Sequence, residues 1–333
     1  MSLWNKKLED QLKKVWADEP KHSLLAKFPD FTYDALRKKA MRLGLHRAAT
    51  QELRASSDEQ ILKRVETLGY QVVKHPQVTD KVFDLSTERF RGDTVRIGIV
   101  SDTHLGSKHQ QLTYLKQIYQ YFAELDIKIV LHGADLLEGN GFLYRGQNFE
   151  MFVHGADEQV DYAINNYPRV KGIKTYIISG NHDLSFFSQS GVDVVKKVCQ
   201  SREDMGYIGQ YSGFINLPGN MLTYLLHGAG ANSYARSYKL QKIVENFSSE
   251  NKPKLFIMGH YHITNVLPNY RNVFSMLPGC FQSQTPFLTR LGLSPDVGGW
   301  VLEYCVNDYD IKNGLTRIKA EWIPFMNHIP NDY

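Results

Sequence analysis

Five short apolar runs, each followed closely by Asp, Asn or His, constrain the fold of this 333-residue chain more than any other feature. Each run has the length and apolar content of a strand that is buried on both faces. The runs lie at residues 95–100, 127–131, 174–178, 221–226 and 254–258. Segments with helical spacing of apolar residues separate the first three runs. This alternation predicts an α/β body, and further strand-like runs follow at residues 272–277, 299–306 and 316–323.

The polar residues behind the five runs are of the types that bind metal ions. They are Asp102 with His104, Asp135, Asn181 with His182 and Asp183, His227, and His260 with His262. Ligand sites in α/β sheets form at the carboxyl ends of strands, so these side chains are expected to converge on one place. One Gly-Asn-His-Asp motif taken alone is an ordinary turn sequence. The ordered set, with one member at each strand end, indicates a functional site.

The order Asp-x-His, Asp, Gly-Asn-His-Asp, His and Gly-His-x-His resembles the calcineurin-like metallophosphoesterase superfamily over residues 95–262. The resemblance implies a four-layer αββα sandwich that continues to about residue 325, and it implies two bound divalent metals. It also implies a ligand set for each metal: Asp102, His104, Asp135 and His262 for the first, and Asp135, Asn181, His227 and His260 for the second. Asp135 would bridge the two metals, and His182 would be the catalytic histidine.

The chemistry of these side chains agrees with that implied site. Carboxylate and imidazole ligands suit manganese, iron or zinc better than calcium, and we expect manganese, with iron, zinc or magnesium as alternatives. A carboxylate that bridges two metals about 3.5–4 Å apart is the arrangement of two-metal hydrolases. We expect His182 to protonate the leaving oxygen or to stabilise the phosphate, and Asp183 to orient His182.

One position departs from the family pattern. The family usually has glycine directly before the bridging aspartate, whereas this chain has Ala134 between Gly133 and Asp135. An alanine methyl is tolerated there if the backbone angles are ordinary. A positive φ would strain Ala134 and would threaten to displace the bridging carboxylate.

The N-terminal segment has a different character. Residues 1–54 hold 12 Lys or Arg and 7 Asp or Glu, a net charge of +5 within a chain of +4. Thr32 is a helix cap and Gly44 a helix stop in a segment that resembles the small helix-turn-helix modules at the front of some phage and bacterial DNA-processing proteins. The resemblance implies DNA contacts by the basic residues of the last helix, which are Arg37, Lys38, Lys39 and Arg42. A structural or oligomerising appendage is the alternative.

These patterns divide the chain into three parts. Residues 1–54 form the helical module, residues 55–93 a connector, and residues 94–333 the metallophosphoesterase domain. Residues 138–153 are expected to form an aromatic loop that covers the substrate. No run approaches the ~18 apolar residues that span a bilayer. The three widely spaced cysteines indicate the reducing cytoplasm, which would be that of the host if the protein is phage-encoded.

The motif variant resembles the DNA-repair nuclease branch of the superfamily and its phage and bacterial relatives. We therefore expect a hydrolase that cleaves phosphodiester bonds in DNA, with DNA as its partner. The alternative is a phosphodiesterase or phosphatase that acts on small nucleotides. A DNA-binding regulator with a vestigial metal site is a third reading, and the complete ligand set argues against it.

Overall fold

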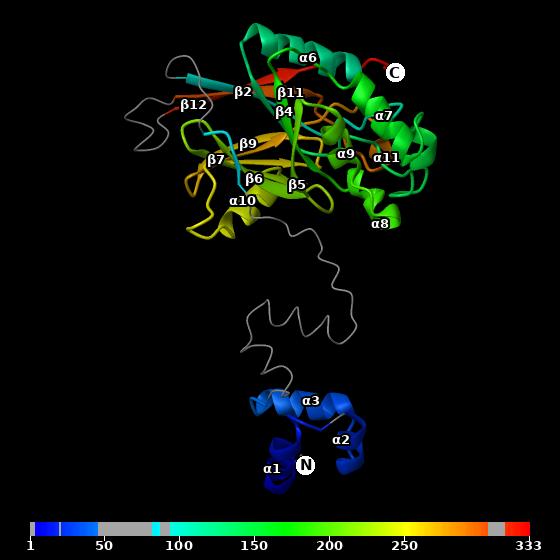
Figure 1. Cartoon of the computed structure of the whole chain (residues 1–333), viewed down its shortest axis with the longest axis vertical. Helices are drawn as coiled ribbons and strands as arrows, with labels where there is room; N and C mark the ends of the chain where they lie inside the picture. Colours follow the sequence, from blue (N-terminus) through cyan, green and yellow to red (C-terminus); the bar gives the residue numbers. More distant parts are fainter. Residues whose placement is uncertain (1–3, 20, 46–81, 87–93, 306–316) are drawn as a thin grey trace. The chain divides into compact units, whose positions relative to one another are not determined.

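A computed structural model describes residues 4–19, 21–45, 82–86, 94–305 and 317–333 (Figure 1). The chain divides into two compact units, Met1–Gln77 and Val78–Tyr333. The expected connector over residues 55–93 lies outside the described residues, apart from 82–86. Where the structure describes helices, none is long and apolar enough to cross a membrane.

The first unit contains three helices, α1 (Lys6–Val15), α2 (Lys21–Lys27) and α3 (Tyr33–Arg42). Side chains cap two of them, because Asn5 accepts a hydrogen bond from the Leu8 amide and Thr32 accepts one from the Ala35 amide. The helices enclose a small core of their own, made of Leu12, Trp16, Leu24, Phe28, Leu36 and Ala40. The helical module expected from the sequence is therefore present, and Thr32 begins its last helix.

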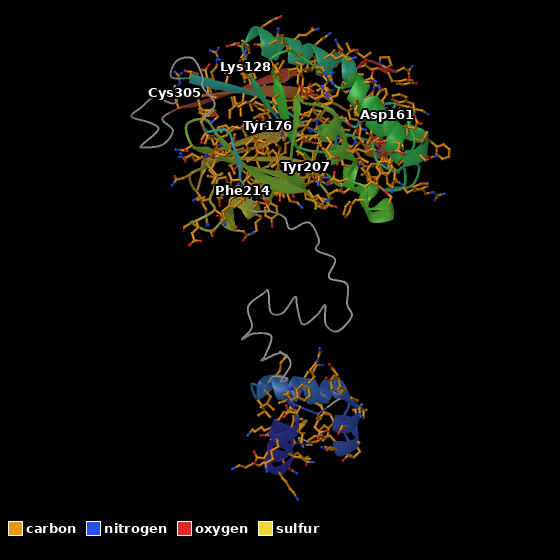
Figure 2. All side chains as sticks on the ribbon, viewed as in Figure 1. Lys128, Asp161, Tyr176, Tyr207, Phe214 and Cys305 are labelled. Carbon is orange, nitrogen blue, oxygen red and sulfur yellow. The ribbon has the colours of Figure 1, made fainter. Side chains whose placement is uncertain are left out.

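The second unit is built on two six-stranded sheets. The first sheet has the order β12 (Ile318–Pro324), β11 (Gly298–Cys305), β2 (Thr94–Val100), β3 (Ile129–His132), β4 (Lys174–Ser179), β5 (Met205–Gln210). The second has the order β1 (Phe83–Asp84), β6 (Ser212–Leu217), β7 (Met221–His227), β8 (Leu255–Gly259), β10 (Val273–Pro278), β9 (Thr264–Tyr270). One core cluster joins the sheets, since Ile97 and Ile178 of the first pack with Leu225 and Ile257 of the second. Tyr176, labelled in Figure 2, belongs to this cluster, and its ring centroid lies 5.1 Å from that of Phe83.

Helices cover the outer face of each sheet. On the first sheet, α6 (Leu112–Glu124), α7 (Ala156–Asn166) and α9 (Val194–Ser201) bury their apolar side chains against the strands. On the second sheet, α10 (Tyr238–Glu245) packs Leu240 and Val244 against Phe256. Figure 1 shows α6 above the first sheet and α10 below the second. The four-layer αββα sandwich expected from the sequence is confirmed. The short helices are α8 (Phe187–Ser190), α11 (Pro286–Arg290), η1 (Gln147–Glu150) and η2 (Asp183–Ser185).

Strand direction brings the carboxyl ends of the central strands together. Strands β2, β3 and β4 run parallel, and so do β7 and β8. The two sheets approach closely at these ends, because a Cβ on Gly259 would lie 2.4 Å from the carbonyl oxygen of Gly133. Only glycine leaves room for that approach. The polar residues that follow the five strands therefore meet in one small space between the sheets.

A single residue carries the chain from one sheet to the other. Tyr211 lies between β5 and β6, and its φ of 55° is unusual for a bulky side chain. Its amide donates to the carbonyl of Ser179 at 2.8 Å, and its carbonyl accepts from the amide of His227 at 2.6 Å. These two hydrogen bonds tie the end of β4 to the end of β7.

Candidate dinuclear metal centre

One set of side chains gathers where β2, β3 and β8 end. Asp102, His104 and Asp135 are buried, and His262 is nearly so. The Nε2 atoms of His104 and His262 lie 3.0 Å apart, and Nε2 of His262 lies 3.5 Å from Oδ1 of Asp102. Oδ2 of Asp135 lies 3.9 Å from Nε2 of His104. These are the four residues that the sequence assigns to a first metal.

A second set shares Asp135 with the first. Oδ2 of Asp135 lies 3.0 Å from Nε2 of His227. The Asn181 Oδ1 atom lies 2.9 Å from His227 Nε2 and 3.0 Å from His260 Nδ1. The two ring nitrogens, His227 Nε2 and His260 Nδ1, are 3.2 Å apart. The structure thus brings together all seven side chains expected to hold metals.

The hydrogen-bond partners of the histidine rings indicate which ring nitrogens can bind a cation. His227 Nδ1 faces the carbonyl of Gly133 at 3.3 Å, and His260 Nε2 faces the carbonyl of Gly230 at 3.1 Å. A carbonyl only accepts, so each ring donates from that nitrogen, and in the neutral rings the other two nitrogens are left as lone pairs for a cation. In the first set, the Glu138 carboxylate likewise accepts a hydrogen bond from Nδ1 of His104, which leaves Nε2 of the neutral His104 ring as a lone pair. Donors bound about 2.1 Å from one metal at right angles would be roughly 3.0 Å apart, which matches the observed spacings. The donor set therefore fits two divalent ions.

The backbone is folded sharply around these donors. Asp102, His104, Asp135, His260 and His262 all have positive φ, between 45° and 90°. Such angles are costly for residues other than glycine, and they cluster at functional sites, where the surrounding structure enforces them. Here they turn the ends of β2, β3 and β8 so that consecutive polar side chains point into one centre.

Ala134 also has a positive φ, 92°, which is the strained case considered from the sequence. The Asp135 carboxylate nevertheless lies between the two sets of donors. His132 supports this turn, because its Nδ1 accepts the Ala134 amide at 3.2 Å. The alanine methyl is fully buried in the core between the sheets. The strain is therefore accommodated without displacing Asp135.

Acidic and basic side chains in the centre lie close together and shift one another's pKa values. Burial alone would raise the pKa of Asp135, but the neighbouring His227 and His182 outweigh burial and hold it well below its ordinary value. Burial would lower the pKa of His227, but Asp135 outweighs it and raises that pKa to about 9. Burial and the adjacent His227 lower the pKa of His260 to about 4. Without metals, a protonated His227 supplies the positive charge that Asp135 requires.

His182 lies beside both sets of donors. Its amide donates to Oδ1 of Asp135 at 3.0 Å, and its Nδ1 donates to the carbonyl of Glu138 at 2.7 Å. Its ring meets that of His104 edge to face, with the centroids 4.5 Å apart. Since Nδ1 is engaged, Nε2 is the nitrogen left for a reacting group.

The prediction that Asp183 orients the His182 ring is wrong. The Asp183 carboxylate instead accepts the backbone amides of Leu136 (3.3 Å), Leu137 (2.9 Å) and Gly180 (2.9 Å). Burial and the nearby Asp135 raise the pKa of Asp183 well above its ordinary value. The Asp183 side chain is short and follows His182 directly, so it bonds the backbone of the neighbouring turns instead of the His182 ring. Asp183 therefore joins the turn that carries Asp135 to the turn that carries His182.

Glu138 is a functional residue that the sequence reasoning missed. Its fully buried carboxylate accepts from His104 Nδ1 (3.1 Å), Gln147 Nε2 (3.0 Å) and Gln282 Nε2 (2.9 Å). Its carbonyl is the acceptor for His182. The sequence feature that could have indicated it is an acidic residue three positions after Asp135, at the start of the loop of residues 138–153. Glu138 orients both a metal-binding histidine and His182.

The basic residues expected to contact DNA lie on α3 of the first unit. Arg37 and Lys38 both pair with Asp34, at 3.0 and 2.8 Å. Lys39 pairs with Glu9 at 2.5 Å and lies 5.4 Å from the ring centroid of Trp4. Arg42 is exposed in the last turn of the helix. Two carboxylates of the same unit thus pair with three of these four basic side chains.

Comparison with known proteins identifies the family. The family model for calcineurin-like phosphoesterases matches residues 95–292, so the chain belongs to this family. The family binds two divalent metals and hydrolyses phosphoesters, and the paired clusters around Asp135 agree with this activity. The chain is accordingly a metal-dependent phosphoesterase. No curated protein matches the chain.

Several solved structures are similar to part of this chain. One is a conserved uncharacterized protein, a predicted phosphoesterase, from Streptococcus pneumoniae (14% identity, TM-score 0.34, 69% of this chain and 99% of that one). Another is a single mutant of Vps29 from Entamoeba histolytica (15% identity, TM-score 0.32, 69% and 99%). A third is vacuolar protein sorting 29 from Cryptosporidium parvum (13% identity, TM-score 0.33, 70% and 99%).

Proposed function

We propose that this phosphoesterase is a nuclease that cleaves phosphodiester bonds in DNA and prefers manganese. The observation that carries the proposal is the pair of donor sets that share Asp135, with ring nitrogens 3.0 and 3.2 Å apart within the sets and His182 beside them. Asp102, His104, Asp135 and His262 would hold one metal, and Asp135, Asn181, His227 and His260 the other. Two such metals activate water near neutral pH and stabilise the charge of an in-line displacement at phosphorus.

The protein side chains would divide the remaining work. The carbonyl of Glu138 fixes the His182 ring through Nδ1, so Nε2 would donate a proton to the leaving oxygen or a hydrogen bond to the phosphate. Asp183 keeps the two turns in register through three backbone amides. The polar atoms are held in place before substrate arrives, which is how electrostatic stabilisation becomes effective.

DNA is favoured as the substrate by the basic first unit. The ion pairs of Arg37 and Lys38 with Asp34, all within α3, are exposed, and exposed pairs are worth only about 0–1 kcal/mol each. A DNA phosphate therefore competes for Arg37 and Lys38 at little cost, and Lys39 and Arg42 lie on the same helix. Such contacts would supply affinity without reading sequence. The three free cysteines of the described chain suit the cytoplasmic setting that belongs to this proposal, that of a host cell for a phage-encoded enzyme.

The same ion pairs support the second candidate, a phosphodiesterase or phosphatase for small nucleotides. Asp34 and Glu9 already pair with three of the four basic residues of α3, so the first unit would then serve only for packing or assembly. The metal centre would perform the same chemistry on a smaller substrate. The two candidates differ in whether the basic residues of α3 affect turnover.

Cleavage of labelled single- and double-stranded DNA with Mn²⁺ tests the proposal. The intact chain should cleave DNA, and His182→Ala should lose the activity while it still binds metal. Replacement of Arg37, Lys38, Lys39 and Arg42 by Gln should weaken DNA binding and reduce its salt dependence. Rapid turnover of bis(p-nitrophenyl) phosphate without DNA cleavage under any metal would establish the second candidate instead.

A further inference from the structure

A loop beside the metal centre exposes two phenylalanine rings. The loop runs from Glu138 to Met151, and Phe142 and Phe149 are 77% and 80% exposed. Burial of a phenylalanine side chain is worth about 1.5–3 kcal/mol, so a loop gains nothing in stability from two rings in water. Single exposed apolar side chains are common, but two large rings in one short loop suggest a ligand.

The loop is firmly built, so the exposure of its rings is imposed by its structure. Gln147 is buried and bonds the start and the middle of the loop: it donates to the carbonyl of Glu138 and accepts from the amide of Leu143, each at 2.9 Å. Tyr144 stacks on Phe287 with ring centroids 4.1 Å apart. Lys108 donates to the carbonyl of Phe149 at 2.9 Å. The scaffold thus holds the two rings away from the core.

The two rings flank a point where the loop folds back on itself. A Cβ on Gly141 would lie 3.6 Å from the Cα of Asn148, so the backbone just before Phe142 lies against the backbone just before Phe149. The loop also rests on the segment of His182. Gln147 Nε2 lies 3.3 Å from His182 Nδ1, and the Asn140 amide donates to Ser185 Oγ at 2.9 Å. The loop that carries the two rings therefore borders the metal centre on its His182 side.

We propose that Phe142 and Phe149 form a stacking platform for unpaired nucleobases of the DNA strand whose phosphate enters the metal centre. The inference rests on the proposed nuclease function and narrows its substrate to DNA with unstacked bases. Every base has a flat face that stacks on an aromatic ring, whereas neighbouring pairs cover those faces inside a duplex. Arg145 is exposed in the same loop and adds a positive charge for the backbone. The occupant therefore carries both phosphate and flat apolar faces, as a single strand does.

The test compares normal and abasic single strands of equal length as substrates for the full chain with Mn²⁺. The double variant Phe142→Leu/Phe149→Leu keeps the apolar surface and removes the flat rings. We expect its KM for the normal strand to rise about tenfold or more, with kcat nearly unchanged. Its KM for the abasic strand should equal that of the unaltered protein. Phe142→Tyr/Phe149→Tyr restores flat rings and should restore the original KM.

Each other outcome overturns the platform. An unchanged KM for the normal strand, or an equal rise for the abasic strand, would show that the rings do not bind bases. A change in self-association alone would assign the rings to a protein contact. Cleavage of neither strand by the unaltered protein would refute the nuclease proposal itself, whereas cleavage with unchanged KM would refute only the platform.

Discussion

Glu138 is a buried side chain that is not an expected metal ligand but bonds one, His104. Its carboxylate accepts three hydrogen bonds, one of them from His104. Glu138→Gln preserves the shape but puts an amide donor among those donors. We expect Mn²⁺ affinity or phosphoester turnover to fall about 10–100-fold, as is usual for a partner of a metal-binding histidine. Metal titration and steady-state kinetics measure both.

Glu150→Gln is the matched control for that variant. Glu150 is a buried carboxylate in the same loop, and it bonds Tyr144 and the amide of Phe287 rather than a metal-binding side chain. Mn²⁺ affinity should stay within about twofold of that of the unaltered protein. An equal loss in both variants would mean that the loop tolerates no change in charge, and Glu138 would have no special role.

Ala134 tests how much strain the bridging turn holds. Ala134→Gly relieves a φ of 92° but loses a buried methyl worth about 0.8 kcal/mol, so its free energy of unfolding should change by less than about 1 kcal/mol. Ala134→Val places a branched side chain at the same angle and should cost about 2 kcal/mol or more, with loss of Mn²⁺ affinity. Urea unfolding and metal titration distinguish the two. A valine variant as stable as the glycine variant would show that the turn is not strained.

His132 should make the protein sensitive to acid. Burial lowers its pKa to about 3, so it is neutral when folded, whereas the unfolded chain protonates it below its ordinary value of 6.5. Its contribution to stability is therefore complete above pH 6.5 and is lost as the pH falls toward 3, by up to about 1.4 kcal/mol per pH unit. His132→Asn keeps an acceptor for the Ala134 amide without the titration. Urea unfolding between pH 7 and 4 should show a shallower loss for the variant, and parallel curves would contradict this.

At the scale of elements, the C-terminal tail supplies a helix cap that α6 lacks locally. Gln111 at the start of α6 makes no side-chain cap, but Asp332 accepts the amide of Thr113 at 2.7 Å and its hydroxyl at 2.6 Å. Asp332→Ala should lower the free energy of unfolding by about 1 kcal/mol. Met326→Ala, at an exposed position of the same tail, should change it by less than about 0.5 kcal/mol. Equal effects in urea unfolding would argue against the cap.

Strands buried on both faces could be predicted from the sequence, whereas several partly exposed strands could not. Strands β2, β3, β4 and β8 read as continuous apolar runs because both faces are covered. Strands β5 and β6 were missed, because each contains glycine and is only partly buried. Strand β9 was also missed; it lies at a sheet edge and contains proline.

In the candidate site, too, some residues could be predicted from the sequence and others could not. Side chains directly behind buried strands could be assigned from their spacing, since strand direction alone brings them together. The partners of Asp183 and Glu138 could not, because each contact joins loops from different parts of the chain. The one-residue crossing at Tyr211 was equally hidden, since a positive φ at tyrosine has no signature in the sequence.

At the scale of the whole molecule, each of the two units has a hydrophobic core of its own. The metal centre belongs to the second unit alone, so metal should stabilise that unit and leave the first unchanged. Mn²⁺ at about 100 times its dissociation constant should add roughly 2.7 kcal/mol to the unfolding free energy of the second unit. Two unfolding transitions are therefore expected, and only one should respond to EDTA.

The four tryptophans provide a separate signal for each transition. Trp4 and Trp16 lie in the first unit, while Trp300 and Trp322 lie on β11 and β12 of the second, with ring centroids 5.1 Å apart. In Trp4→Phe/Trp16→Phe, fluorescence reports only the second unit, and its urea midpoint should rise when Mn²⁺ replaces EDTA. In Trp300→Phe/Trp322→Phe, fluorescence reports only the first unit, and its midpoint should stay constant. A common shift in both variants would mean that the units unfold as one, and metal binding would then stabilise the basic module as well as the catalytic sandwich.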